Sequence, residues 1–197
     1  MRGWIPGLLI VCGAALFLVW GSLAGPDSPP KLDARSAIVL ASGIVASVAD
    51  GDTIRLADNR RIRLVQIDAP ERPSGECYAE RATTALTRLA PVGVEVKLRL
   101  DRALNAKDEH GRFLAYVHNG TKNLNLELVD MGAAAPYFFQ GKRGQYAEDL
   151  MRAARRAQTA RKGLWGACPG TTLDPRRRVD TGKLAAVGAS PRARLAP

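Results

Sequence analysis

The sequence predicts an α+β fold, a small closed β-barrel capped by helices and preceded by an apolar N-terminal helix. Three observations carry this prediction. Short segments with alternating apolar and polar residues, typical of β-strands, follow one another from about residue 43. A segment with helical periodicity interrupts them after the third strand, and two more helical segments follow the last strand. Several short strands with helices placed in this way favour a barrel over an open sheet.

The first strands include a hairpin. The segments "GIVASVADGDTIRL" and "RRIRLVQI" alternate in the β sense on either side of the turn "ADN". The second hairpin strand is expected to separate apolar from polar side chains, with Ile62, Leu64 and Ile67 on one side and Arg61, Arg63 and Gln66 on the other. The segments "VEVKLRL" and "RFLAYVHNG" are expected to form two further strands.

Three segments have helical periodicity. The first, "ECYAERATTALTRLAP", stops at Pro91 and places its apolar residues on one face, namely Ala79, Ala82, Leu86 and Leu89. The second, "LNLELVDMG", is short and ends at Gly132, a residue type suited to the position after a helix. The third runs over about residues 145–162 and stops at Gly163.

Composition divides the chain into four parts. Residues 1–24 are apolar, residues 25–42 form a linker, residues 43–170 form the domain, and residues 171–197 form a basic tail expected to be disordered. The overall content of 46% hydrophobic and 24% charged residues is typical of a globular protein.

The N-terminal part is a targeting or anchoring segment. It contains 22 consecutive uncharged residues, "WIPGLLIVCGAALFLVWGSLAG", enough to cross a bilayer as a helix. The "SLA" before Gly25 also has the small residues of a signal cleavage site. We therefore keep both possibilities, a cleaved signal peptide and a membrane anchor through residues 3–24. Since Arg2 favours a cytoplasmic N-terminus, both place the domain outside the cytoplasm, in the periplasm or secreted.

The chain is strongly basic. It has 29 Lys and Arg against 19 Asp and Glu, a formal net charge of +10. Residues 44–170 alone carry 20 basic and 15 acidic residues, so the excess is not confined to the tail. This charge favours polyanionic partners such as nucleic acid or anionic lipid.

Two cysteines remain once Cys12 is assigned to the apolar segment. Cys77 and Cys168 lie near the two ends of the domain, and an exported domain permits a disulfide between them. Two unrelated free thiols are the alternative. We expect the disulfide.

Four carboxylates gather at one end of the predicted hairpin. Asp50 and Asp52 of "DGD" open one strand, while Asp68 and Glu71 of "DAPE" follow the other. Carboxylates brought together repel one another unless a cation or arginines compensate them. Oxygen ligands without His or Cys indicate Ca²⁺ or Mg²⁺, and Arg63 nearby offers a fork that matches two phosphate oxygens.

Five motifs follow one another in an order and spacing that extend over about residues 44–166: "VADGDTIRL", "RIRLVQIDAPE", "DEHGRFLAYV", "LNLELVDMGAA" and "ARRAQTARKGLWG". In these motifs the chain resembles the staphylococcal-nuclease-like, or thermonuclease, family. The resemblance implies a five-stranded OB-fold barrel with three helices, acting as a monomer. It also implies hydrolysis of single-stranded DNA and RNA by in-line attack of water, leaving 3′-phosphates.

The resemblance also implies residue roles. Asp52, Asp68 and the backbone carbonyl of Ala69 would bind Ca²⁺, and Asp50 would support the metal and its water ligands. Glu71 would orient the attacking water and act as its general base, while Arg63 and Arg112 would clamp the scissile phosphate.

Three departures from the family pattern bear on these roles. Ala69 replaces a threonine, His110 stands where a tyrosine is common, and the loop "RPSGEC" after Glu71 is short. The aromatic residues of "AAAPYFFQG" are equally compatible with stacking on bases and with the core.

The rival interpretation is a catalytically inactive OB-fold module that binds nucleic acid or another polyanion at the membrane surface.

Overall fold

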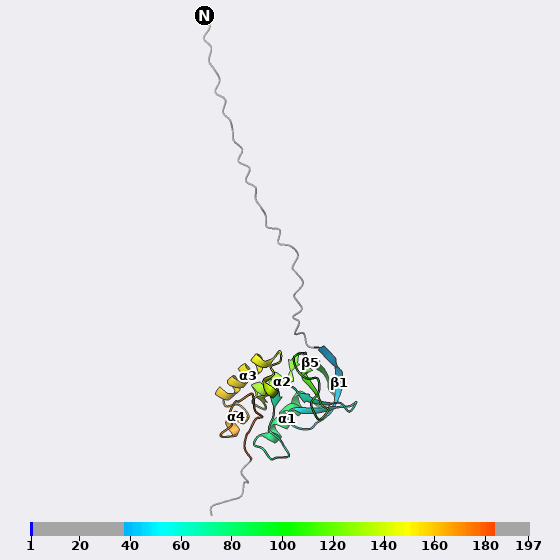
Figure 1. The fold of residues 1–197 in the computed structure, drawn as a ribbon, viewed down its shortest axis with the longest axis vertical. Helices are drawn as coiled ribbons and strands as arrows, with labels where there is room; N and C mark the ends of the chain where they lie inside the picture. Colours follow the sequence, from blue (N-terminus) through cyan, green and yellow to red (C-terminus); the bar gives the residue numbers. More distant parts are fainter. Residues whose placement is uncertain (2–37, 184–197) are drawn as a thin grey trace, which may run out of the picture. The chain divides into compact units, whose positions relative to one another are not determined.

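Five strands pair into a closed ring (Figure 1). In ring order they are β3 (Arg61–Leu64), β2 (Thr53–Leu56), β1 (Ile38–Val48), β5 (Glu95–Leu100) and β6 (Phe113–Asn119). All neighbours are antiparallel except β3 and β6, whose parallel pairing closes the ring. The predicted class, a five-stranded barrel with helices, is confirmed.

The structure, a computed structural model, describes residues 38–183 and Met1. The expected N-terminal helix, most of the linker and residues 184–197 lie outside these residues. No helix in the described part is both long enough and apolar enough to cross a membrane.

The helices occupy the positions in the chain that periodicity predicted, with shorter bounds. They are α1 (Ala79–Leu89), α2 (Leu124–Asp130), α3 (Ala147–Thr159) and the single turn α4 (Leu164–Ala167), which the sequence did not predict. In Figure 1, α3 and α4 lie on the side of the domain away from β1 and β5. α2 packs against both β6 and α3, so it joins the barrel to the C-terminal helices.

Short irregular elements complete the domain. β4 (Ile67–Asp68) pairs with β8 (Ala135–Pro136), β7 (Lys122–Asn123) pairs with the end of β6, and η1 (Phe139–Gly141) follows β8. Between β3 and β4 the chain reverses at Gln66, which has a left-handed φ of 65°. The Gln66 side chain donates to the carbonyl of Lys142 and accepts from the amide of Gly144, so it fixes the loop after η1.

The hairpin of β2 and β3 forms around the expected turn. Thr53 pairs with Arg63 and Ile54 with Ile62, and Asn59 takes the left-handed turn position with a φ of 67°. Ile62, Leu64 and Ile67 are fully buried in the main core, as the alternation predicted. Arg63 and Gln66 are buried too, so the polar side of this segment is also covered.

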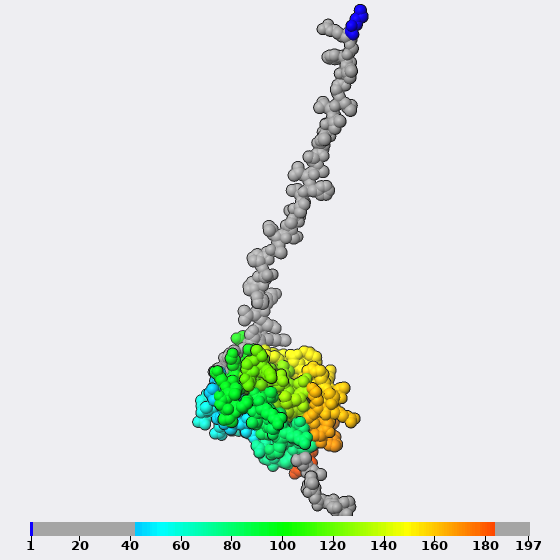
Figure 2. All heavy atoms as spheres, turned by 180° about the vertical axis from the view of Figure 1, so that it is seen from behind, coloured from blue at the N-terminus to red at the C-terminus, as the bar shows by residue number. Residues whose placement is uncertain are grey.

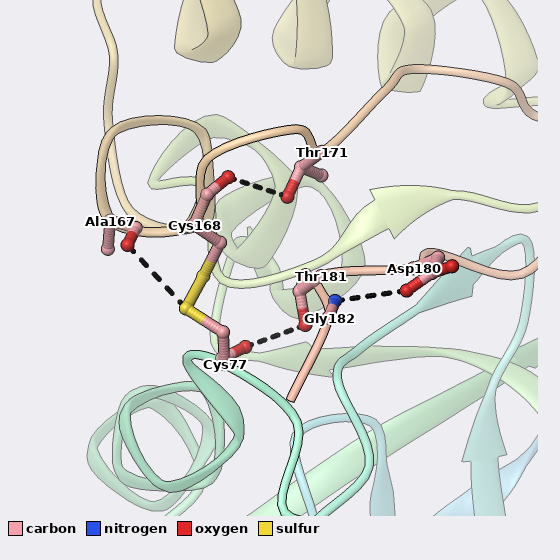
Figure 3. Close-up of a disulfide and its surroundings, with 7 residues drawn as sticks. All are labelled: Cys77, Ala167, Cys168, Thr171, Asp180, Thr181 and Gly182. Atoms are coloured by element: carbon pink, nitrogen blue, oxygen red, sulfur yellow. Dashed lines mark hydrogen bonds between the residues drawn. A yellow bond between two sulfur atoms is a disulfide. The ribbon is translucent and has the colours of Figure 1, made fainter. Parts of the chain in front are cut away.

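A disulfide joins Cys77, just before α1, to Cys168, just after α4 (Figure 3). Its two cysteines form a second, smaller core with Ala135, Leu164 and Val179. The predicted pairing is confirmed, and the bond fixes the C-terminal helices to the start of α1.

The folded domain extends beyond the expected boundary at residue 170. Residues 171–183, assigned to a disordered tail from their composition, run over the domain and pair with it as far as a bridge between Glu76 and Lys183. In Figure 2 the orange and red atoms of this segment lie against the teal atoms of the region around α1. Hydrogen bonds and the apolar contact of Val179 hold the segment, and neither produces periodicity in the sequence.

Removing the disulfide is expected to destabilise the oxidised protein by about 4–5 kcal/mol, because it closes a loop with a sequence separation of 91 residues. The measurement is urea denaturation of a Cys77→Ser/Cys168→Ser variant beside wild type. Cys12→Ser is the matched control, since that cysteine lies outside the described domain. Equal free energies of unfolding for the double variant and the control would show that the bond contributes nothing.

Candidate active site

The "DGD" turn between β1 and β2 lies against the segment that leaves β4. The carboxylate of Asp52 accepts the amide of Ala69 at 2.9 Å, and the carboxylate of Asp50 accepts the amide of Asp52 at 3.0 Å. Glycine is required between them because a Cβ at Gly51 would come within 2.6 Å of the Cβ of Ala69 and 2.8 Å of that of Ala82. The two ends of the hairpin therefore meet, as the sequence predicted.

Arg63 connects the two aspartates. Its Nη2 lies 2.8 Å from Oδ1 of Asp68 and 2.9 Å from Oδ2 of Asp52. Its Nη1 donates to the carbonyl oxygens of Leu64 and Ile67, both at 2.7 Å. Only 8% of Arg63 is exposed, so these contacts fix the guanidinium in one position.

The carboxylate cluster of Asp50, Asp52, Asp68 and Glu71 brings several negative charges into a mostly buried region. Burial raises the pKa of Asp52 to about 7, while the positive charge of Arg63 acts against this rise. Burial also raises the pKa of Asp68, again opposed by Arg63. The pKa of Glu71 is raised by burial and then by the charges of Asp50 and Asp68. The site therefore favours additional positive charge.

The donor set fits a hard divalent cation with few protein ligands. Within residues 38–183, no three His, Cys, Asp or Glu side chains are grouped so that they could hold a metal ion by themselves. Asp52 and Asp68 nevertheless direct one oxygen each to a single nitrogen atom of Arg63. Since Ca²⁺ takes six to eight oxygen ligands, backbone, water and phosphate oxygens would complete such a site.

Arg112 is positioned by the tight turn before β6. The carboxylate of Asp108 accepts the amides of His110 and Arg112, and its other oxygen accepts Nε of Arg112 at 2.6 Å. The parallel pairing of β3 with β6, with Ile62 opposite Phe113, sets this turn beside Arg63. The two predicted arginines therefore come from distant parts of the sequence to neighbouring positions at adjacent strands.

Both arginines line one pocket of about 280 Å³. Basic residues dominate its charged lining: Arg63, Lys107, Arg112, Lys142 and Arg178 against Asp108 and Glu109. Tyr137 and Phe139 supply an aromatic wall, with ring centroids 6.4 Å apart, whereas Phe138 points into the core and is only 2% exposed. The aromatic run thus serves both the core and the pocket. His110 also lines the pocket.

Glu71 lies at the start of the short loop that leads to α1. Its amide donates to the carboxylate of Glu76 at 2.9 Å, and its carbonyl accepts from the hydroxyl of Ser74 at 3.1 Å. These bonds close the loop on itself, so the short segment holds the Glu71 side chain at the edge of the cluster. The carboxylate is partly exposed, as a group that meets water must be.

Sequence reasoning missed the contribution of the C-terminal segment. The amide of Val179 donates to Oδ2 of Asp68 at 3.0 Å, and Nη1 of Arg178 lies 3.4 Å from Oε1 of Glu71. No signal in "DPRRRVDTGK" pointed to these contacts, because they join residues more than a hundred positions apart. The described site therefore includes residues that lie outside the sequence motifs.

Comparison with known proteins shows which family and which relatives the chain is similar to. A family model described as staphylococcal nuclease homologue matches residues 61–167. A thermonuclease of Staphylococcus intermedius is 29% identical over 167 residues, 81% of this chain and 95% of the relative. An uncharacterised endonuclease of Haemophilus influenzae is 32% identical over 127 residues, 61% of this chain and 64% of the relative. Endonuclease YhcR of Bacillus subtilis is 31% identical over 138 residues, which are only 11% of that protein.

Proposed function

Because the chain belongs to the family of staphylococcal nuclease homologues and is a nuclease that hydrolyses phosphodiester bonds, we propose that it is a Ca²⁺-dependent enzyme. Its proposed substrates are single-stranded DNA and RNA, cleaved to products with 3′-phosphates. One observation carries the proposal: Arg63 binds both Asp52 and Asp68 while it lines a basic pocket. A carboxylate pair and a basic pocket thus share one side chain.

Asp52, Asp68 and the backbone carbonyl of Ala69 would hold the cation, with Asp50 supporting its water ligands. When bound, the cation supplies positive charge to the phosphoryl oxygens and to the attacking water. The position of Asp50 agrees with a supporting role, since one of its oxygens is already occupied by the amide of Asp52.

The remaining steps belong to the chain's own groups. Arg63 and Arg112 hold the scissile phosphate from two sides of the pocket and stabilise the charge that develops on its oxygens. Glu71, partly exposed beside the carboxylate cluster, orients a water molecule in line with the leaving oxygen and accepts its proton. The buried contacts of Arg63 keep its guanidinium in place throughout.

The aromatic wall supports a single-stranded substrate. Unpaired bases can leave their stack and lie on the rings of Tyr137 and Phe139, while the basic side chains follow the phosphates. This preference is independent of sequence, because every base has a face that can stack.

The proposed location is outside the cytoplasm, with residues 3–24 as a signal peptide or membrane anchor and the domain acting as a monomer. The disulfide between Cys77 and Cys168 supports this location, since such bonds persist in oxidising compartments. The rival function, an inactive OB-fold module that binds polyanions, would not require the five residues Asp52, Arg63, Asp68, Glu71 and Arg112 to lie at one site.

The metal requirement provides the test. Oxidised, purified protein is expected to cleave labelled single-stranded DNA and RNA in Ca²⁺, and to lose at least about a hundredfold in rate when a chelator removes the ion. Mg²⁺ in place of Ca²⁺ and duplex DNA in place of single strands are the comparisons. Salt-sensitive binding without cleavage in either metal would support the inactive binding module instead.

A further inference from the structure

The segment of residues 174–183 forms one edge of the active site and lies beyond the residues matched by the family model. It contributes the side chain of Arg178, which lines the same pocket as Arg63 and Arg112. We propose that Arg178 is a third phosphate-binding arginine of this enzyme, which holds the backbone phosphate next to the scissile one. The proposal rests on the nuclease function proposed above.

The segment is a fixed part of the domain. The carbonyl of Pro175 accepts the amide of Phe138 at 2.6 Å, and Val179 donates to Asp68. Two residues later Thr181 donates to the carbonyl of Cys77 at 2.8 Å (Figure 3). The carbonyl of the next residue, Gly182, accepts the amide of Cys77 at 2.8 Å. Arg178 therefore lies between two anchored positions, and its backbone is held in place without substrate.

Cys77 anchors the segment twice. It is bonded to Cys168, which precedes the segment in the chain, and its backbone pairs with Thr181 and Gly182 near the end of the segment. Val179 and Thr181 are buried, so the chain directly after the exposed Arg178 side chain is packed against the domain. This arrangement is expected of a residue that binds substrate in every turnover.

The guanidinium of Arg178 has donors to spare. Arg63 donates to two carboxylates and two carbonyls, and Arg112 uses Nε on Asp108. Among the described residues, the one hydrogen bond of the Arg178 side chain is the 3.4 Å contact with Glu71, and 58% of the side chain is exposed. A long, exposed ion pair contributes little free energy. A phosphate, which can take two parallel N–H bonds, is the stronger partner.

The neighbouring arginines have different surroundings. Arg176 pairs with Asp174 at 3.1 Å and is mostly exposed. Arg177 and Arg178 both line a second hollow of about 300 Å³ formed by the C-terminal segment, but Arg177 does not line the active-site pocket. Within the run "RRR", only Arg178 reaches the pocket, so Arg177 is a matched control with the same change of charge one residue away.

The test compares Arg178→Ala, Arg178→Lys and Arg177→Ala with wild type, each as the full chain with its disulfide formed. Arg178→Ala is expected to raise KM for single-stranded DNA roughly ten- to a hundredfold, with most of kcat retained, because a charge-assisted contact made in both ground and transition states is lost. Arg178→Lys should recover part of the loss, and Arg177→Ala should have the KM of wild type. Equal melting temperatures would exclude a folding defect.

Binding of a labelled single-stranded oligonucleotide in chelator provides a second readout. In Arg178→Ala, the slope of log Kd against log salt concentration should fall by about 0.7, the value for one phosphate contact on a single strand, and Arg177→Ala should keep the wild-type slope. Absence of cleavage in every metal would refute the proposed function. The binding measurement would still show whether Arg178 contacts a phosphate.

Three outcomes would overturn the proposal. Equal changes in Arg178→Ala and Arg177→Ala would show that only total charge matters. A loss of kcat at unchanged KM would show that Arg178 acts through Glu71 rather than on substrate. Faster turnover in Arg178→Ala would show that its contact with Glu71 obstructs the reaction.

Discussion

Replacing Glu71 by glutamine is expected to lower kcat by about 10²–10⁴-fold while leaving the fold intact. Glutamine keeps the size and hydrogen-bonding reach of the side chain but cannot accept the proton of the attacking water. The carboxylate is partly exposed, and its only ion pair between described residues is the 3.4 Å contact with Arg178, so stability should change little. Steady-state cleavage of single-stranded DNA measures the effect.

Glu80→Gln is the matched control for this substitution. Glu80 lies in the first turn of α1 and is well exposed, and its ion pair within residues 38–183 is with Arg72 on the surface. It should have wild-type kcat and melting temperature. If Glu71→Gln instead retained kcat within about tenfold of wild type, Glu71 would not be the general base, and another acceptor would have to be sought.

Arg63→Ala is expected to lose about 10²–10³-fold in kcat and also to destabilise the protein by about 3–5 kcal/mol. The second effect arises because Asp52 and Asp68 would remain buried without their shared positive partner. Arg63→Lys keeps the charge but not the planar fork that reaches both carboxylates and two carbonyls. Lysine should therefore restore part of the stability and little of the rate. Kinetics and urea denaturation on the same preparations separate the two effects.

Arg61→Ala serves as the control, since Arg61 lies two residues away on the same strand and is exposed. It should leave both the rate and the free energy of unfolding near wild type. Near-wild-type turnover in Arg63→Ala, measured below its melting temperature, would remove Arg63 from the catalytic site.

Local pattern was sufficient for part of this architecture. The alternation around "ADN" predicted the hairpin, and a hairpin brings its two ends together whatever surrounds it, so Asp52 and Asp68 could be placed near each other from the sequence. The end of α2 was also predictable, because Gly132 takes a left-handed backbone conformation that favours glycine. The end of α3 was not: it ends at Thr159, and the expected stop, Gly163, instead precedes α4.

Other features depend on contacts that no local pattern encodes. Alternation implied that Arg63 lies on a polar, accessible side of β3, but that rule assumes one solvated face. Here the carboxylate cluster covers that side and buries the arginine. The contribution of Arg178 depends on a segment with no periodicity, which is held at the site by contacts with distant residues such as Cys77.

The parallel pairing of β3 with β6 links the folding of the domain to the assembly of its active site. Arg63 lies on β3, and Arg112 comes directly before β6, with α1 and β5 between them in the chain. A partly folded chain can contain the β2–β3 hairpin and every helix, yet still keep these two arginines apart. Contacts between distant residues form slowly because the intervening loop must first be closed. Because the two proposed phosphate-binding arginines meet only through this pairing, we expect a chain whose ring is still open to be inactive on nucleic acid.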